Sequence, residues 1–340
     1  MRPAAWCALA AAGVLLAAAQ LGGEAGAQEA LSKLARSPGF LSCITALEFG
    51  VRADAAEVYV PRAAAAARDE DAAEPQSESV YVPAAPENTA PVLSAPDKAA
   101  TLTINNDTDY DVDVAACLAS DTHILAEGDG PQVLVFHTHA SESYTPDAAF
   151  PYTPTETERT TDTRYNVVRV GDELCTALEK RGIETLHIRS LFDTPTYAGS
   201  YDRSLAAVEQ ALEENPSVKV VIDLHRDSIL TDEGEAYKTS CTVDGAETAQ
   251  LMFVVGTDAG GLYHPDWRDN LNFVSTLQYA LNRAYPSLMR PVNLRTQRFD
   301  QHASPGSLLV EVGSSGNTLP EALSAVRLFA DVLADEMTGM

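Results

Sequence analysis

The chain has few basic side chains and no regular spacing of cysteines. Its 340 residues include 23 Lys and Arg against 49 Asp and Glu, which gives a formal net charge of −26. A chain this acidic repels nucleic acid and anionic lipid, and no basic stripe offsets the repulsion. The five cysteines contain no C-x-x-C pair, which argues against a disulfide framework and against a thiolate zinc site. We therefore expect no nucleic-acid partner and no cross-linked scaffold.

Four common motifs of catalysis and nucleotide binding are also missing. The sequence has no G-x-S-x-G nucleophile elbow, no H-E-x-x-H helix, no G-x-G-x-x-G turn and no phosphate-binding G-x-x-x-x-G-K-[ST] loop. Their absence disfavours serine hydrolases and nucleotide-binding enzymes. An apolar content of 45% in a chain of this length still allows a substantial core.

The N-terminal segment resembles an export signal. Arg2 precedes an apolar stretch at 4–19, and Ala25-Gly26-Ala27 is a small-x-small pattern that a signal peptidase recognises. Because the apolar run is near the lower limit for spanning a bilayer, residues 1–27 are predicted to be either a cleaved signal peptide or a membrane anchor. In both cases the remainder of the chain is exported.

Three further segments precede the main domain. Residues 28–60 are predicted to form a short helical segment. Residues 61–98 are rich in alanine, proline, serine and acid, which predicts a disordered acidic linker. Residues 99–130 are predicted to be a small β lead-in element, with strands at 101–104 and 112–114 around a polar turn. The alternative for this last segment is an irregular lead-in that packs on the main domain.

From residue 131 to 340, strand patterns alternate with helical patterns. This alternation predicts an α/β fold with a twisted, mostly parallel sheet and helices on both faces. A polar segment at 231–248 is typical of a hairpin, and 146–163 of a long loop over the site. Strands are predicted at 133–136, 184–188, 218–224, 251–256 and 307–312, and helices at 165–181, 201–215, 267–285 and 319–337.

Three of the predicted strands end in residues that bind metals. The first is followed by His137-Thr138-His139 and Glu142, the second by His225, and the last runs into Glu311. In an open α/β sheet, ligands gather beyond the carboxyl ends of the strands. Two histidines and one carboxylate, with a fourth position open for water, form a catalytic zinc set. The sequence therefore predicts a zinc site at this edge of the sheet.

The predicted metal ligands are His137, Glu142 and His225. His139 is the alternative to His137, because alternate residues of a strand point the same way. Asp162 is the alternative to Glu142, because it lies just before a predicted helix and can point at the same place. For each histidine alone, the simpler interpretation is a hydrogen-bonded residue near the surface.

Glu311 is predicted to be the catalytic general base and acid. It follows three apolar residues, and burial in an apolar setting raises the pKa of a carboxyl group towards the range useful for proton transfer; the alternative is a solvated position on an edge strand. Asp223 and Asp227 flank His225, and one of them is expected to orient its imidazole. Arg226 is expected either to hold a substrate carboxylate or oxyanion or to pair with a nearby acid.

These stretches together resemble the stage II sporulation protein P family of endospore-forming bacteria. The shared motifs occur in the same order and at similar spacing through nearly all of residues 131–340. A single H-T-H motif would be much weaker evidence of a relationship. The motifs are His137-Thr138-His139-x-Ser141-Glu142-Ser143-Tyr144, Tyr165-Asn166-Val167-Val168-x-Val170-Gly171-Asp172, Ile222-Asp223-Leu224-His225-Arg226-Asp227, Val254-Val255-Gly256-Thr257 and Leu309-Val310-Glu311-Val312-Gly313.

The resemblance implies a metal-dependent cell-wall hydrolase whose fold is similar to that of the zinc N-acetylmuramoyl-L-alanine amidases. It also implies endopeptidase activity on cross-links, a membrane-anchored role in engulfment, and stage II sporulation proteins D and M as partners. The residues carried over are His137 and His225 as metal ligands and Glu311 as the catalytic acid. Asp300-Gln301-His302 departs from the expected asparagine-glutamine-acid pattern, which puts substrate contacts in question.

We therefore expect an exported, membrane-tethered or secreted zinc amidase whose substrate is peptidoglycan. If the N-terminal segment is not cleaved, it is the contact with the membrane. Two alternatives are a non-catalytic wall-binding module of the same fold and a metal-dependent peptidase of another substrate. Metal content and the masses of the released fragments distinguish the three.

Overall fold

The computed structural model describes residues 102–155, 158–230 and 236–339. The predictions made for residues 1–27, 28–60 and 61–98 lie outside the described residues. Among the helices of the described part, none combines the length and apolarity needed to cross a membrane.

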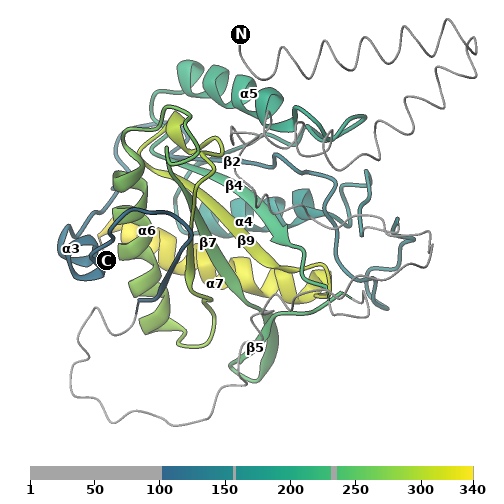
Figure 1. Cartoon of the computed structure of the whole chain (residues 1–340). Coiled ribbons are helices and arrows are strands. Elements are labelled where there is room, and N and C mark those ends of the chain that lie inside the picture. Colours follow the sequence, from purple (N-terminus) through teal and green to yellow (C-terminus); the bar gives the residue numbers. More distant parts are fainter. Residues whose placement is uncertain (1–101, 156–157, 231–235, 340) are drawn as a thin grey trace, which may run out of the picture.

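A seven-stranded sheet forms the centre of the described region (Figure 1). Five of its six strand pairings are parallel, and the pairing between β7 and β9 is antiparallel. The prediction of a mostly parallel sheet is therefore confirmed. In spatial order the strands are β1 (Ile104–Asn106), β8 (Val292–Arg295), β7 (Leu251–Gly256), β9 (Ser307–Ser314), β4 (Val220–Asp227), β2 (Val133–Phe136) and β3 (Thr185–His187).

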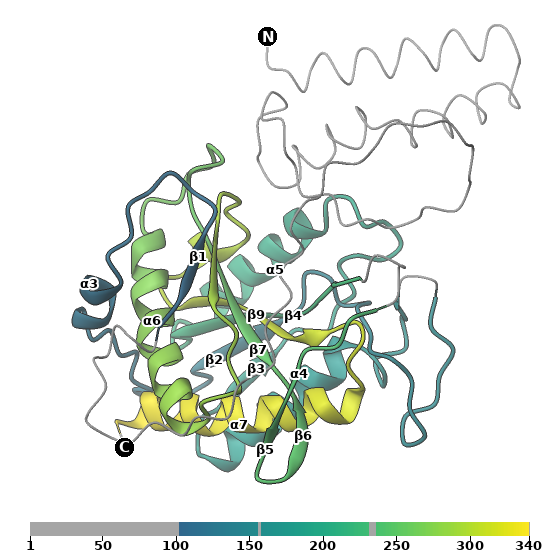
Figure 2. The ribbon, with the colours of Figure 1, turned by 60° about the horizontal axis from the view of Figure 1, so that its bottom comes forward.

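Helices cover both faces of this sheet, as predicted. The larger apolar cluster joins one face of the strands to α4, α6 and α7, while a smaller cluster packs α5 on the opposite face (Figure 2). The sequence places apolar residues on both faces of the central strands, as their burial requires. The helices are α3 (Val114–Ala119), α4 (Val167–Lys180), α5 (Ser200–Glu214), α6 (Trp267–Ala284) and α7 (Leu319–Thr338), with a short 3-10 helix η2 (Gln301–Ala303).

The ends of the helices follow from local sequence. The side chain of Asn166 accepts a hydrogen bond from Val168 N at the start of α4, and Gly182 follows its end with φ at +81°, the left-handed conformation that glycine adopts readily. At the start of α7, Thr318 and Glu321 form a capping box. All four predicted helices are present, with ends that differ by one or two residues.

The predicted β lead-in element is partly wrong. The strand at 112–114 does not form, because Asp113 accepts a hydrogen bond from Ala116 N and starts α3 at Val114. β1 joins the edge of the main sheet beside β8, a strand that the sequence patterns missed. The predicted hairpin is confirmed as β5 (Ser240–Val243) and β6 (Ala246–Ala249), with Asp244 and Gly245 at positive φ in the turn.

Candidate metal centre

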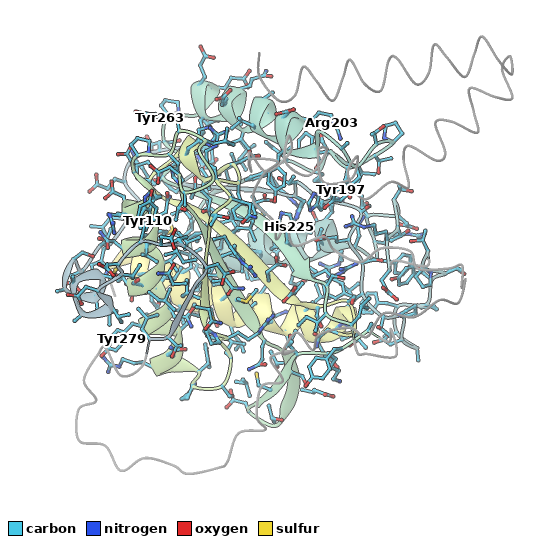
Figure 3. All side chains as sticks on the ribbon, viewed as in Figure 1. Tyr110, Tyr197, Arg203, His225, Tyr263 and Tyr279 are labelled. Atoms are coloured by element: carbon cyan, nitrogen blue, oxygen red, sulfur yellow. The ribbon has the colours of Figure 1, made fainter. Side chains whose placement is uncertain are left out.

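Three buried side chains near the ends of β2 and β4 are close enough to share one metal ion. They are His139, Glu142 and His225, and each offers a ligand atom within 4.8 Å of the others. His225 lies on β4, near the centre of the molecule in Figure 3, while His139 and Glu142 lie on the turn that follows β2. Adjacent strands of a parallel sheet end at the same edge, which is why segments far apart in sequence meet here.

His139 has the surroundings of a ligand. Its Nε2 is buried and has no hydrogen-bond partner, a costly state for a polar atom unless something else binds it. The ring stacks on Tyr197, with centroids 4.4 Å apart, and meets Tyr201 edge to face. Burial lowers the pKa of His139 well below its usual value, so the imidazole is neutral and its lone pair can bind a cation.

Glu142 is held as an ionised carboxylate. Its Oε2 accepts a hydrogen bond from the backbone N of Arg226 (3.2 Å) and its Oε1 lies 3.3 Å from the Arg159 guanidinium. Burial acts to raise its pKa, but the hydrogen bond with His225 and the charges of His225 and the two arginines outweigh burial and lower the pKa. An ionised carboxylate beside a neutral imidazole suits a zinc ion.

Asp223 lies beside the imidazole of His225. Its Oδ1 is 2.8 Å from His225 Nε2, at an angle outside that of a regular hydrogen bond. Burial lowers the pKa of His225, but the two carboxylates of Asp223 and Glu142 together outweigh burial and raise the pKa. Asp227, the other flanking acid, pairs with Arg290 (2.7 Å).

His137 is not brought into this cluster, so the structure favours the alternative, His139, as the ligand. The ring of His137 is fully buried, with Nδ1 2.8 Å from Leu224 O and Nε2 2.9 Å from His187 Nε2. The reason is local: β2 ends at Phe136 and the chain turns at once. The rule that alternate residues point the same way holds only while a strand continues.

Asp162 is also not part of the cluster. Its carboxylate is partly exposed and pairs with Arg164 two residues along the loop. The hydrogen bonds from that side chain lower the pKa of Asp162 to about 2. Of the two alternatives for the carboxylate ligand, the structure brings Glu142 to the histidines.

Glu311 lies beside the cluster, on the neighbouring strand. It is paired with His225 in the ladder between β4 and β9. Its Oε2 is enclosed and has no hydrogen-bond partner. Burial, and next the negative charge of Asp227, raise the pKa of Glu311 to about 8. A carboxyl group with a pKa in this range can both accept and donate a proton near neutral pH.

The side chain of Arg226 contacts the backbone of the loop after β2. Its guanidinium donates hydrogen bonds to the backbone carbonyls of Ser143 (2.8 Å) and Glu158 (2.8 Å). These bonds tie the loop after β2 to β4. Arg226 therefore supports the backbone that carries Glu142.

Several residues near the cluster have no signal in the sequence. Arg159 donates to Asp193 Oδ2 (2.9 Å), contacts Glu142, and lies over the Tyr197 ring at 5.1 Å. Asp193 in turn accepts a hydrogen bond from Ser141 N (3.2 Å). All of these residues belong to loops, where neither periodicity nor strand ends predict position, and no motif contains Arg159 or Tyr197.

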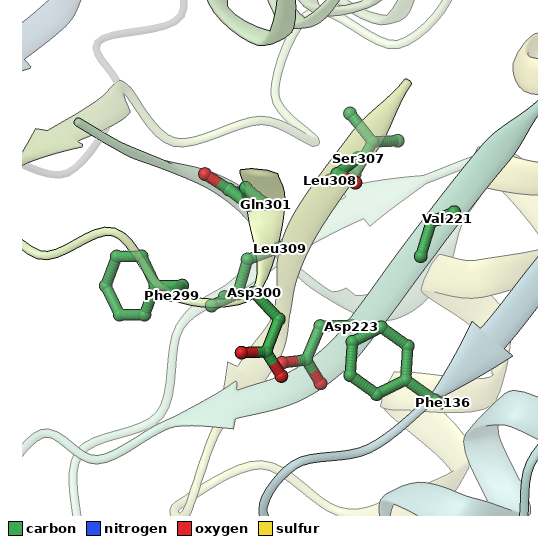
Figure 4. A pocket seen from close by; sticks show the side chains of 9 residues that line it. All are labelled: Phe136, Val221, Asp223, Phe299, Asp300, Gln301, Ser307, Leu308 and Leu309. Atoms are coloured by element: carbon green, nitrogen blue, oxygen red, sulfur yellow. The ribbon is translucent and has the colours of Figure 1, made fainter. Parts of the chain in front are cut away.

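A small pocket lies beside Asp223 (Figure 4). Figure 4 shows the carboxyl groups of Asp223 and Asp300 facing each other at one end of it. Gln301 lines another side and bonds the backbone of β7, accepting from Gly256 N and donating to Val254 O. The remaining walls are mostly apolar, which places Asp300 in a setting that disfavours a charge.

Comparison with known proteins identifies the family. The model of the family described as stage II sporulation protein P (SpoIIP) matches residues 55–334. The chain belongs to the stage II sporulation protein P family. The stage II sporulation protein P of Bacillus subtilis (strain 168) is 30% identical over 219 residues, which make up 61% of this chain and 51% of that protein. The family member described here thus matches about half the length of that relative.

Two solved structures are similar over most of their own length. One is the N-acetylmuramoyl-L-alanine amidase AmiC2 of Nostoc punctiforme, with 11% identity, a TM-score of 0.35, and coverage of 62% of this chain and 98% of that one. The other is the N-acetylmuramyl-L-alanine amidase Ami1 from Mycobacterium smegmatis, with 14% identity, a TM-score of 0.37, and coverage of 64% and 98%. TM-scores of this size do not establish a shared fold.

Proposed function

We propose that this member of the stage II sporulation protein P family is a zinc-dependent peptidoglycan hydrolase, an N-acetylmuramoyl-L-alanine amidase. The observation that carries the proposal is the meeting of His139, Glu142 and His225 around one point, with Glu311 on the next strand. Membership of the family agrees with it. Endopeptidase activity on cross-links, implied by the resemblance, is part of the same proposal.

The roles of the residues follow from their surroundings. A zinc ion bound there would lower the pKa of a water molecule and polarise the carbonyl of the substrate amide. Glu311 accepts a proton from the attacking water and gives it to the leaving amine, because its raised pKa suits both directions of transfer. Asp223 orients the imidazole of His225.

The place of action and the partners follow from the resemblance and the N-terminal sequence. The protein acts outside the cytoplasm on the cell wall during engulfment, either tethered through residues 1–27 or secreted. Stage II sporulation proteins D and M are the proposed partners. The proposed tether, residues 1–27, lies outside the described residues.

The test is digestion of purified sacculi by the exported part of the chain. We expect release of free stem peptides, loss of release after treatment with a chelator, and recovery on addition of Zn²⁺. Glu311→Gln should lower the rate about 100- to 10,000-fold while Zn²⁺ still binds. Glu213→Gln, which changes an exposed carboxylate on α5, is the matched control and should leave the rate unchanged.

The outcomes separate the alternatives. Full activity of Glu311→Gln would reject its assignment as the catalytic acid and base. Binding to sacculi without release, whether or not zinc is present, would identify a wall-binding module. Release of fragments whose masses show cleavage within the peptides alone would identify a peptidase.

A further inference from the structure

A continuous line of buried polar side chains runs from His225 away from the metal cluster to Asp300. It passes through Asp223 on β4, Thr138 on the turn after β2, and Ser204 on α5. All of these side chains are buried, with Thr138 and Ser204 fully enclosed. Buried polar groups of this kind act as a unit when every member is satisfied.

The distances along the line are those of good hydrogen bonds. Thr138 donates to Asp223 twice, from N to Oδ1 (2.9 Å) and from Oγ1 to Oδ2 (2.7 Å). The hydroxyls of Thr138 and Ser204 lie 2.9 Å apart, and Ser204 Oγ lies 2.7 Å from Asp300 Oδ2. Each link joins a different segment of the chain, so the line also fixes how these segments lie against β4.

Ser204 is the branch point of the line. Its hydroxyl lies within hydrogen-bond distance of Thr138 Oγ1 and Asp300 Oδ2, and also 3.1 Å from Tyr201 O on its own helix. These contacts fix the hydroxyl, and Thr138 beside it donates to Asp223. Asp300 is therefore linked to Asp223 through two hydroxyl groups.

The result of this arrangement appears at His225. Asp223 Oδ1 lies 2.8 Å from His225 Nε2 and covers that side of the ring. The other ring nitrogen, Nδ1, faces Glu142 Oε2 at 3.5 Å. A carboxylate beside one nitrogen of a metal-binding histidine commonly fixes the orientation of the ring in this way.

We propose that Ser204 and Asp300 are positioning residues of the metal centre, which hold Asp223 through Thr138 so that His225 presents Nδ1 to the ion. This inference rests on the proposed function, because it concerns the same ion. The proposed role also explains why position 300 carries a carboxyl group. The walls of the pocket around it, such as Phe136 and Phe299, would accommodate an apolar side chain at a lower free-energy cost.

The experiment measures the affinity for Zn²⁺ of the exported part of the chain in competition with a chelator, near neutral pH. The variants are Ser204→Ala, Asp300→Ala and Asp300→Asn. We expect the two alanine variants to bind Zn²⁺ about tenfold more weakly, the lower end of the effect of residues that orient ligands. Asp300→Asn should bind like the wild type, because the asparagine side chain can still form a hydrogen bond with Ser204.

A second readout identifies the nitrogen that binds the ion. NMR of imidazole nitrogens in isotopically labelled, zinc-loaded protein should show His225 bound through Nδ1 in the wild type and in Asp300→Asn. Ser204→Ala should show a mixture of the two nitrogens. A purely structural role of Ser204 would lower the melting temperature without changing this signature.

The outcomes distinguish this inference from the proposed function. If the wild type binds no Zn²⁺, both are overturned. If the wild type binds Zn²⁺ and all variants bind equally well, the positioning role alone is overturned. Equal weakening by Asp300→Asn and Asp300→Ala, or binding through Nε2 in the wild type, would also overturn it. If Asp300→Ala does not fold, as circular dichroism would show, Ser204→Ala and Asp300→Asn still decide the matter.

Discussion

Two pairs of histidines lie near the end of β2, and their surroundings differ. His137 and His187 contact each other through Nε2 and have partners on their outer nitrogens as well, Leu224 O for one and Asp172 for the other. His139 and His225 meet with their ring centroids 5.1 Å apart, and Nε2 of His139 has no partner. Protein groups satisfy the first pair, whereas the second keeps a buried nitrogen that no protein group satisfies.

The comparison shows that the role of a histidine depends on which group binds its second ring nitrogen. Gly171 lies against the first pair so closely that an added Cβ would be 2.7 Å from both Nε2 atoms. The neighbours of the second pair are the carboxylates of Glu142 and Asp223 and the aromatic rings of Tyr197 and Tyr201. Three predictions test this difference, and a fourth concerns Asp300.

The largest expected effect is on metal affinity. His139→Ala removes a ligand and should weaken Zn²⁺ binding more than about 100-fold, beyond the range for residues that only orient ligands. His137→Ala should leave the affinity close to that of the wild type, because His137 does not face the ion. Chelator competition measures both. Stronger loss in His137→Ala than in His139→Ala would reverse the assignment of the two histidines.

The second prediction concerns stability. His137→Ala leaves the buried Leu224 carbonyl without its imidazole partner, which costs about 1–3 kcal/mol, and the lost packing adds to this. Denaturant unfolding measures the change. His123→Ala alters a partly exposed histidine and is the control, with little expected loss. An unchanged midpoint for His137→Ala would show that its hydrogen bonds do not support the fold.

The third prediction tests the close packing of the first pair. Gly171→Ala places a methyl group against His137 and His187, and overpacking of this kind costs about 1–3 kcal/mol. Gly182→Ala is unsuitable as a control because Gly182 has a positive φ. Ala177→Gly on the same helix α4 is the control. Its lower helix propensity should reduce the unfolding free energy by about 1 kcal/mol. A stabilised Gly171→Ala variant would show that the histidines move aside freely.

The fourth prediction is a pH dependence. Burial raises the pKa of Asp300 to about 8, whereas an Asp in an unfolded chain titrates at about 3.9. Between these values the unfolded chain releases a proton that the folded chain keeps, so this residue's contribution to the unfolding free energy is fully present below about pH 4 and is lost as pH rises to about 8. Asp300→Asn removes this dependence.

The measurement is the unfolding free energy of the wild type and of Asp300→Asn at several pH values. The difference between them should grow in favour of the variant as pH rises from about 4 to about 8, and then stay constant. A difference that does not change with pH would show that Asp300 titrates normally in the folded protein.

Much of the fold was predictable because its strongest signals are local. Apolar periodicity predicts all four long helices, and short apolar runs predict β2 and β7 to the residue. β8 was missed because Val292–Arg295 alternates over only four residues, too few for the pattern to stand out. The strand predicted at 112–114 failed because the cap at Asp113 outweighs the β propensity of valine.

The site was predictable in part. Strand ends correctly directed attention to the segments after β2, β4 and β9, and a flanking acid beside His225 was expected. Whether His137 or His139 faces β4 depends on the turn after Phe136, which no pattern specifies. Ser204 and Asp300 reach Asp223 through contacts between distant segments, and pairings of this kind leave no trace in a single sequence.

The antiparallel contact between β7 and β9 divides the sheet into two halves that run in opposite directions. The carboxyl ends of β2 and β4 lie at the edge of the sheet where the metal cluster forms. The carboxyl ends of β7 and β8 lie at the opposite edge, where Tyr263 is exposed. The connection between β7 and α6 therefore starts at the edge of the sheet opposite to His139, Glu142 and His225. A fluorescent reporter attached at the solvent-exposed Tyr263 would report from that opposite edge.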